Sequence, residues 1–193
     1  MQCDNNFERP AVFHGIAMWD QLPDIPLYMD QVISYMSRQL DDDDHLTPSM
    51  IHNYTKEHLL PRSEGKKYSK EHIASLTAVC LLKQILTVRD AKYLMRNNIA
   101  GKNISDFYDD MKDLLDEDIK KAEAEIPDSP DKSQLAEAAL QLAVSAYAEQ
   151  LICRKILENL RSKDPDERSH DHDHDHDRHT SESVSVDKNS SES

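Results

Sequence analysis

Residues 47–69, TPSMIHNYTKEHLLPRSEGKKYS, constrain the fold more than any other segment of this chain. The opening Thr-Pro pair supplies a favourable N-cap and first helical residue, so a helix is expected over residues 48–59. Pro61 ends that helix because proline has no amide proton to donate. Gly65 then predicts the tip of a short hairpin, and Ser69 caps the next helix. The segment therefore predicts two helices joined by a small hairpin.

Apolar residues at helical spacing predict further helices on both sides of this segment. The 193 residues include only three glycines and few aromatic residues, so extended β structure has little support. The fold class expected is therefore mainly all-α. The predicted helices cover residues 28–40, 48–59, 69–82, 87–95, 105–125 and 131–162.

Composition also divides the chain into parts. Residues 1–20 read as an irregular lead-in, and residues 21–125 read as the packed domain. Pro127 and Pro130 separate this domain from a long, alanine-rich helix, which we assign with its linker to residues 126–162. Residues 163–193 contain almost no apolar side chains and cannot offset the entropy of ordering, so this tail is predicted to be disordered.

Positive charge is concentrated in one part of an acidic chain. Residues 47–102 contain ten Lys and Arg against four Asp and Glu, a charge of +6. The rest of the chain contains 13 basic against 33 acidic residues, a charge of −20, which together recover the net −14. A local reversal of sign of this kind is typical of a surface that binds an anionic partner such as DNA.

The sequence excludes several other classes of protein. No basic segment followed by an apolar core opens the chain, and no run of ~18 apolar residues occurs, so neither a signal peptide nor a membrane span is expected. Cys3, Cys80 and Cys153 are odd in number and far apart, as in reduced cytoplasmic proteins. Glycine-rich phosphate loops, nucleophile elbows and HExxH or CxxC motifs are missing, so no enzymatic activity is expected.

Two stretches carry a resemblance to known families. LPDIPLYMDQVISYM and LTPSMIHNYTKEHLLPRSEGKKYSKEHIASLTAVCLLKQIL, within residues 20–125, resemble the bacterial family described only as domain of unknown function 1836. Over residues 28–95, the order of helix, turn, helix and basic turn is similar to the winged helix-turn-helix of MerR-class transcription regulators. This resemblance implies a second helix in the DNA major groove, a wing on the DNA backbone, and an antiparallel homodimer through the helix at residues 131–162.

Seven residues are the candidate contacts to double-stranded DNA. Four lie on the predicted second helix, facing away from its apolar stripe, and three lie in the predicted wing, residues 62–69. Among them Asn53 is the best base reader, because an Asn side chain can bond bidentately to adenine. His52 and Asn53 stand where the MerR class usually has an arginine and a tyrosine, and His58 stands at its usual glycine. The candidates are Ser49, His52, Asn53, Lys56, Arg62, Lys66 and Lys67.

The tail segment HDHDHDHDRH alternates imidazoles with carboxylates, which are ligands that suit zinc or nickel. A defined metal site needs fixed geometry and supporting contacts, which a disordered segment does not provide. No cofactor is therefore expected, and weak zinc or nickel binding by the tail is the alternative. Its ligands would be His170, His172, His174, His176 and His179.

The sequence thus favours a cytoplasmic, non-enzymatic, DNA-binding transcription regulator. Two other functions stay open at this point. The helix-turn-helix scaffold could instead dock another protein, as an interaction adaptor, and the histidine-rich tail could sense or buffer metal. Binding to DNA that weakens steeply with salt would distinguish the first function from the second.

Overall fold

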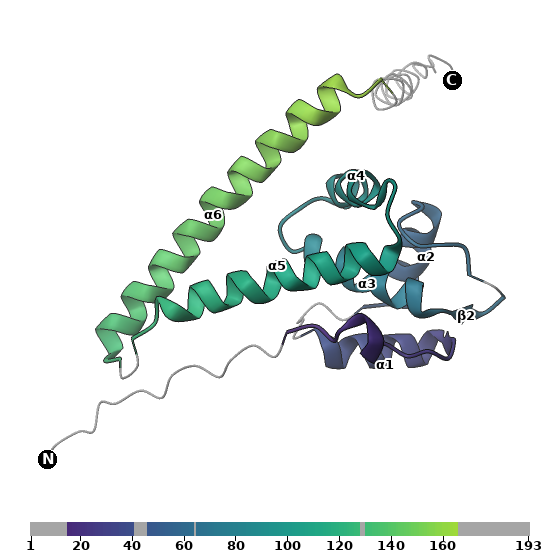
Figure 1. The fold of residues 1–193 in the computed structure, drawn as a ribbon, viewed down its shortest axis with the longest axis horizontal. Coiled ribbons are helices and arrows are strands. Elements are labelled where there is room, and N and C mark those ends of the chain that lie inside the picture. Colours follow the sequence, from purple (N-terminus) through teal and green to yellow (C-terminus); the bar gives the residue numbers. More distant parts are fainter. Residues whose placement is uncertain (1–14, 41–45, 64, 128–129, 166–193) are drawn as a thin grey trace, which may run out of the picture. The chain divides into compact units, whose positions relative to one another are not determined.

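The computed structural model describes residues 15–40, 46–63, 65–127 and 130–165. The chain divides into two compact units, Met1–Leu151 and Ile152–Ser193. The described part is mainly helical, as predicted, with one small antiparallel sheet (Figure 1). Its elements are η1 (Trp19–Gln21), β1 (Leu27–Tyr28), α1 (Met29–Gln39), α2 (Pro48–Lys56), β2 (Lys67–Tyr68), α3 (Lys70–Leu82), α4 (Val88–Ile99), α5 (Ile104–Ala124) and α6 (Lys132–Lys163).

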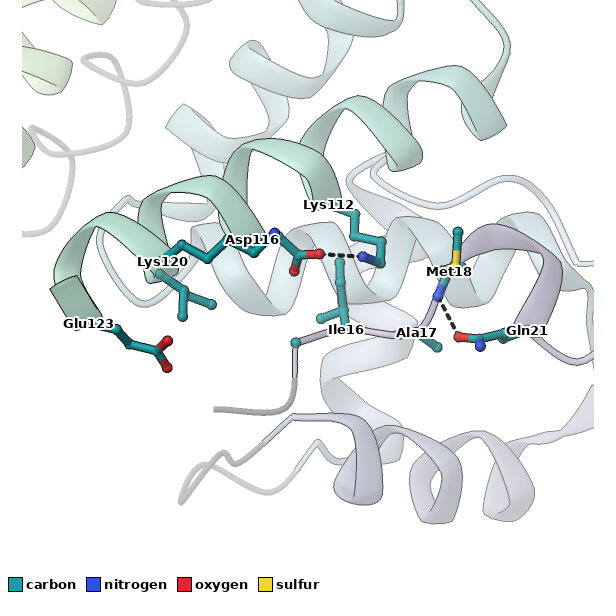
Figure 2. A pocket seen from close by; sticks show the side chains of 10 residues that line it. Ile16, Ala17, Met18, Gln21, Lys112, Asp116, Lys120 and Glu123 are labelled. Carbon is teal, nitrogen blue, oxygen red and sulfur yellow. Dashed lines mark hydrogen bonds and ion pairs between the residues drawn. The ribbon is translucent and has the colours of Figure 1, made fainter. Parts of the chain in front are cut away.

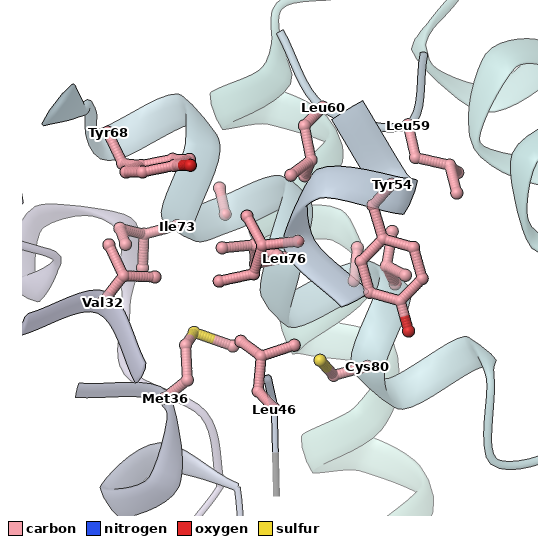
Figure 3. Close-up of a cluster of buried hydrophobic side chains, with 14 of the residues drawn as sticks. Val32, Met36, Leu46, Tyr54, Leu59, Leu60, Tyr68, Ile73, Leu76 and Cys80 are labelled. Atoms are coloured by element: carbon pink, nitrogen blue, oxygen red, sulfur yellow. The ribbon is translucent and has the colours of Figure 1, made fainter. Parts of the chain in front are cut away.

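Helix α3 is the centre of the packed core. Apolar side chains occur all around it, so it buries nearly its whole circumference rather than a single stripe. Its most extensive contacts are with α5, and α1, α4 and β2 also pack on it. Figure 3 shows Ile73 and Leu76 of α3 among side chains from α1, α2 and β2, including Met36, Tyr54 and Tyr68. Burial of these apolar side chains is the main stabilising contribution to the fold.

The lead-in before α1 is part of this core. Ile16 and Leu22 are buried, and the Trp19 ring meets the Tyr108 ring of α5 edge to face, with centroids 6.1 Å apart. The Tyr108 hydroxyl donates a hydrogen bond to the Ala17 carbonyl at 2.8 Å. The packed core therefore reaches back to Ile16, beyond the expected domain boundary at residue 21.

Helix α2 ends three residues earlier than the proline stop predicted. Its last turn closes through hydrogen bonds from His58 N–H to the Thr55 carbonyl (3.1 Å) and from Leu59 N–H to the Tyr54 carbonyl (2.9 Å). This is the Schellman arrangement, in which the residue after the C-cap is left-handed. His58 is that residue, with φ of 57°. The backbone turns at His58, so Leu59 and Leu60 enter the core from outside the helix.

The left-handed conformation of His58 predicts that a glycine at this position would raise the free energy of unfolding. His58→Gly is expected to stabilise the protein by about 1 kcal/mol, because glycine adopts positive φ without the steric cost of a Cβ atom. His58→Ala, the matched control, keeps the Cβ atom and should not stabilise. Urea denaturation of the three proteins measures the difference, and equal midpoints for the Gly and Ala variants would contradict this account.

The wing forms differently from the local hairpin that was predicted. Gly65 does lie in a turn, with φ of 69°, but β2 does not pair with the residues just before that turn. It pairs antiparallel with β1, with Leu27 opposite Tyr68 and Tyr28 opposite Lys67. This pairing lets the buried Tyr68 and the partly buried Leu27 pack together on the core. The residues just before the Gly65 turn, Arg62 and Ser63, have no apolar side chain that could take the place of Leu27. The prediction of a hairpin within residues 62–69 is therefore wrong.

The remaining helices agree with the predicted periodicity, although α4 continues to Ile99 rather than residue 95. Within the described residues, no helix combines the length and apolar character needed to cross a bilayer. The acidic run at residues 41–44 lies outside the described residues, as does the tail from residue 166 onward. Lys163, the first residue of the predicted disordered tail, instead ends α6. From residue 166 onward, disorder of the tail stays a prediction.

Candidate nucleic-acid interface

Helix α2 has one buried face and one exposed polar face. Thr47 begins the helix, since its Oγ1 accepts a hydrogen bond from the Met50 N–H at 3.3 Å. Ile51 and Tyr54 are buried against the core. The side chains at intervals of three and four residues on the other side are all exposed, as predicted. We call these the polar face of α2: Ser49, His52, Asn53 and Lys56.

The side chain of Asn53 is uncommitted within the described part of the chain. Its backbone carbonyl accepts the hydrogen bond from the Glu57 N–H that closes the helix, at 2.8 Å. The side-chain amide makes no hydrogen bond to any described residue, unlike Asn97 and Asn98 of α4, whose amides donate to carbonyls of their own helix. Asn53 thus keeps both its donor and its acceptor available for a base edge.

The predicted wing cations are also exposed. Arg62 and Lys66 lie in the loop between α2 and β2, and Lys67 begins β2. Among the described residues, no carboxylate forms an ion pair with these three cations or with Lys56. The Lys67 ammonium lies 5.3 Å from the centroid of the Tyr28 ring, a contact that does not neutralise its charge.

Other basic residues of the window 47–102 are engaged within the protein. The Lys92 ammonium lies 3.7 Å from a carboxylate oxygen of Glu57, and the Lys102 ammonium lies 2.6 Å from one of Asp110. Lys83, Arg89 and Arg96 also have interaction partners. The surface that remains available to an anionic partner is thus smaller than the charge count alone indicates, and it centres on α2 and the wing.

His72 is a buried histidine at the root of the wing, which sequence analysis did not single out as a core residue. Its Nδ1 accepts a hydrogen bond from the Ser69 N–H at 3.1 Å, and its ring meets the Tyr68 ring edge to face at 5.5 Å. Burial lowers the pKa of His72, and the Pro61 carbonyl, the Glu71 carboxylate and the Arg62 carbonyl oppose this effect only partly. The one sequence feature that could have indicated a structural role for His72 is its position in the first helical turn after the Ser69 cap.

The lowered pKa of His72 predicts a pH dependence of stability. The unfolded chain binds this proton near pH 6.5 and the folded protein only at lower pH, so the free energy of unfolding should decline as pH falls below about 6.5. His72→Asn, which removes the buried imidazole, should reduce that slope. Urea denaturation midpoints, measured from about pH 7.5 to about pH 5 so that the range spans the ordinary histidine pKa, check this prediction.

Two of the cavities on the first unit lie near the wing and the lead-in. One, of about 410 Å³, is at the root of the wing between Pro26, Arg62, Lys67 and His72. Figure 2 shows the other, of about 450 Å³, between the lead-in and α5, where the Lys112 ammonium pairs with Asp116 at 2.5 Å. Its side chains carry both signs of charge, so it attracts neither cations nor anions strongly.

Metal binding finds no support in the described residues, where no group of three or more His, Cys, Asp or Glu side chains is arranged to hold an ion. The five tail histidines, His170 to His179, lie outside those residues. Weak zinc or nickel binding by the tail therefore stays a prediction.

Comparison with known proteins identifies a family. A family model described as "Domain of unknown function (DUF1836)" matches residues 17–114, just over half of the 193 residues. The matched range covers the lead-in from Ala17 onward, the polar face of α2, the wing, and α5 as far as Leu114. No curated protein and no solved structure has significant similarity to the chain.

Proposed function

Because the chain belongs to the DUF1836 family, whose description assigns no activity, we propose a function from its surface: non-catalytic binding of double-stranded DNA by a MerR-like transcription regulator. The observation that carries the proposal is a set of seven exposed polar and basic side chains with no carboxylate partner among the described residues. Four form the polar face of α2 and three belong to the wing. They are Ser49, His52, Asn53, Lys56, Arg62, Lys66 and Lys67.

Electrostatics supports an orientation for the complex. The chain carries −14 overall, and residues outside the window 47–102 account for −20. DNA phosphates are repelled by the acidic remainder of the chain and attracted by the exposed cations of α2 and the wing. The protein would therefore approach DNA with these two elements foremost.

The two elements have different roles in this proposal. A helix the width of α2 fits the major groove, and its polar face presents an amide, an imidazole and an ammonium on one side. Asn53 pairs with adenine, which contributes about 1–3 kcal/mol of discrimination against the wrong base. Arg62, Lys66 and Lys67 bind phosphates and supply affinity that is independent of sequence.

Helix α6 supports a homodimer as part of the proposal. Its 32 residues include apolar side chains that stay exposed at intervals of four, three and four residues, the spacing of a coiled-coil seam. They are Leu140, Val144, Tyr147 and Leu151. A second copy of the chain is the occupant we propose, since two identical helices with this seam bury one another and DNA operators are commonly two-fold symmetric.

A salt series with the full-length protein tests DNA binding. Fluorescence anisotropy with a mixed-sequence duplex is expected to show affinity falling by about 10³ or more between 50 and 200 mM salt, as for six or more phosphate contacts. No binding at the low-salt end would refute the proposal. Genomic footprinting then identifies the target sequence, and Asn53→Ala should lose that sequence preference while its salt dependence persists.

Light scattering tests the dimer separately. The protein is expected to be a dimer at micromolar concentration, and Val144→Glu combined with Tyr147→Glu should make it monomeric. Gln141→Glu with Ser145→Glu, which add the same charge on another face of α6, should leave the dimer intact. A monomeric parent protein would remove the dimer alone and leave the proposed DNA binding untouched. The second candidate function, an adaptor that docks another protein on the helix-turn-helix scaffold, is favoured instead if the protein does not bind DNA at low salt.

A further inference from the structure

We propose that the residues before α1 form half of the DNA-binding wing, with Tyr28 and Lys67 acting as a pair on one backbone phosphate. This inference rests on the proposed DNA binding and assigns a contact, Tyr28, that lies outside the predicted interface. It follows from the pairing of β1 with β2, which brings together residues 39 positions apart in the sequence.

The two-stranded sheet has an inner and an outer face. Successive side chains of a strand point to opposite faces, and residues directly opposite each other point to the same one. Leu27 and Tyr68 form the inner pair, since Tyr68 is buried and Leu27 packs against the core. Tyr28 and Lys67 form the outer pair, and both are exposed, Tyr28 to 51%. The outer face therefore presents a phenol beside an ammonium.

The contact between these two side chains prepares Lys67 to bind an anion. The ammonium lies 5.3 Å from the centroid of the Tyr28 ring, whose electron-rich face attracts a cation. A carboxylate partner would cancel the charge of Lys67, but the ring restricts its motion and leaves the charge intact. Tyr28 also keeps its hydroxyl uncommitted among the described residues.

The lead-in is held firmly enough to take part in binding. The Lys70 ammonium of α3 lies 2.7 Å from a carboxylate oxygen of Asp24 and 5.3 Å from the centroid of the Trp19 ring. The Tyr28 N–H donates to the Gln31 side chain at 2.9 Å. These contacts fix the segment on both sides of β1, and the first of them neutralises the acidic residue nearest to β1 on its N-terminal side.

A phosphate is the ligand that suits this pair. The Tyr28 hydroxyl and the Lys67 ammonium are both donors, and a backbone phosphate presents two unesterified oxygens that accept hydrogen bonds. Every nucleotide carries the same phosphate, so a contact to it carries no sequence information. Their contribution should therefore be independent of DNA sequence, and only the Lys67 part should depend on salt.

A double-mutant cycle measured by anisotropy with the mixed-sequence duplex tests the pair. Tyr28→Phe removes only the hydroxyl and should weaken binding about three- to tenfold without changing the salt slope. Lys67→Gln should reduce the slope by about 0.9 for each DNA-bound protomer. Tyr28→Leu, which removes the ring, should lose less affinity in the Lys67→Gln background than alone. Tyr35→Phe, which removes the hydroxyl of a partly buried tyrosine on α1 outside the two strands, is the control and should bind as the parent does.

The outcomes separate this inference from the proposal on which it rests. If the parent protein fails to bind the duplex at low salt, both are overturned. If the parent binds and Arg62→Gln reduces the salt slope, but Tyr28→Phe binds unchanged and the Tyr28→Leu and Lys67→Gln effects simply add, only the Tyr28–Lys67 pair is overturned. Inhibition by inorganic phosphate at constant ionic strength, lost in the Lys67→Gln variant, would identify a free-phosphate site instead and would also overturn it.

Discussion

Replacing Arg62, Lys66 and Lys67 together by glutamine is expected to lower DNA affinity by about two to three orders of magnitude near 0.1 M salt. Each phosphate contact contributes about 0.9 to the salt slope, so losing three should reduce the slope by about 2.7 for each DNA-bound protomer. The three side chains are exposed and have no carboxylate partner among the described residues, so their removal should leave stability nearly unchanged. Anisotropy titrations across a salt series measure both affinity and slope.

The matched control changes the net charge equally at other places. Lys120, Lys132 and Lys155 are exposed on α5 and α6, away from the wing in sequence. Their replacement by glutamine should lower affinity only slightly, through the weaker long-range field. If both triple variants lose affinity and slope to the same extent, attraction is a property of total charge, and the surface formed by α2 and the wing has no special role.

Tyr108→Ala is expected to have the largest effect on stability, a loss of about 3–5 kcal/mol in the free energy of unfolding. The side chain is fully buried on α5, and its ring meets Trp19 of the lead-in. Burial strongly raises the pKa of the Tyr108 hydroxyl, so it stays protonated and continues to donate to the Ala17 carbonyl. Urea denaturation followed by circular dichroism measures the loss.

Two conservative variants separate the parts of this effect. Tyr108→Phe keeps the ring and removes the hydrogen bond to Ala17, so about 1 kcal/mol should be lost. Phe107→Ala removes a neighbouring aromatic side chain that is only partly buried, and its cost should be smaller than that of Tyr108→Ala. If both alanine variants lose the same free energy of unfolding, the complete burial of Tyr108 does not account for its contribution to stability.

Local features of the sequence predicted the elements that depend on a few neighbouring residues. Thr47 and Pro48 start α2 because a cap and a first-turn proline act within one helical turn. Apolar residues at helical spacing predicted α3, and the apolar stripe of α2 correctly indicated which side of that helix is exposed, opposite the buried Ile51 and Tyr54. Family membership was also readable from the sequence, and the match at residues 17–114 confirms it.

The position of α2's end was not readable in the same way. Pro61 is a strong stop signal, but the helix ends before it, where His58 takes a conformation that glycine usually supplies. The gain that offsets this local strain is burial of Leu59 and Leu60 in the core. A rule based on single residues does not predict this helix end, because the contacts that compensate for the strain at His58 are made with other elements of the fold.

The sequence alone determined that this chain is mainly helical, where most helices begin, and which side of α2 is exposed. Only the tertiary structure decided that β2 pairs with β1, that the lead-in belongs to the core through Trp19 and Tyr108, and that Tyr28 lies beside Lys67. The reason is physical. Caps and helical periodicity act over a few residues, whereas the partner of a short strand is selected by the total burial of side chains that are distant in sequence.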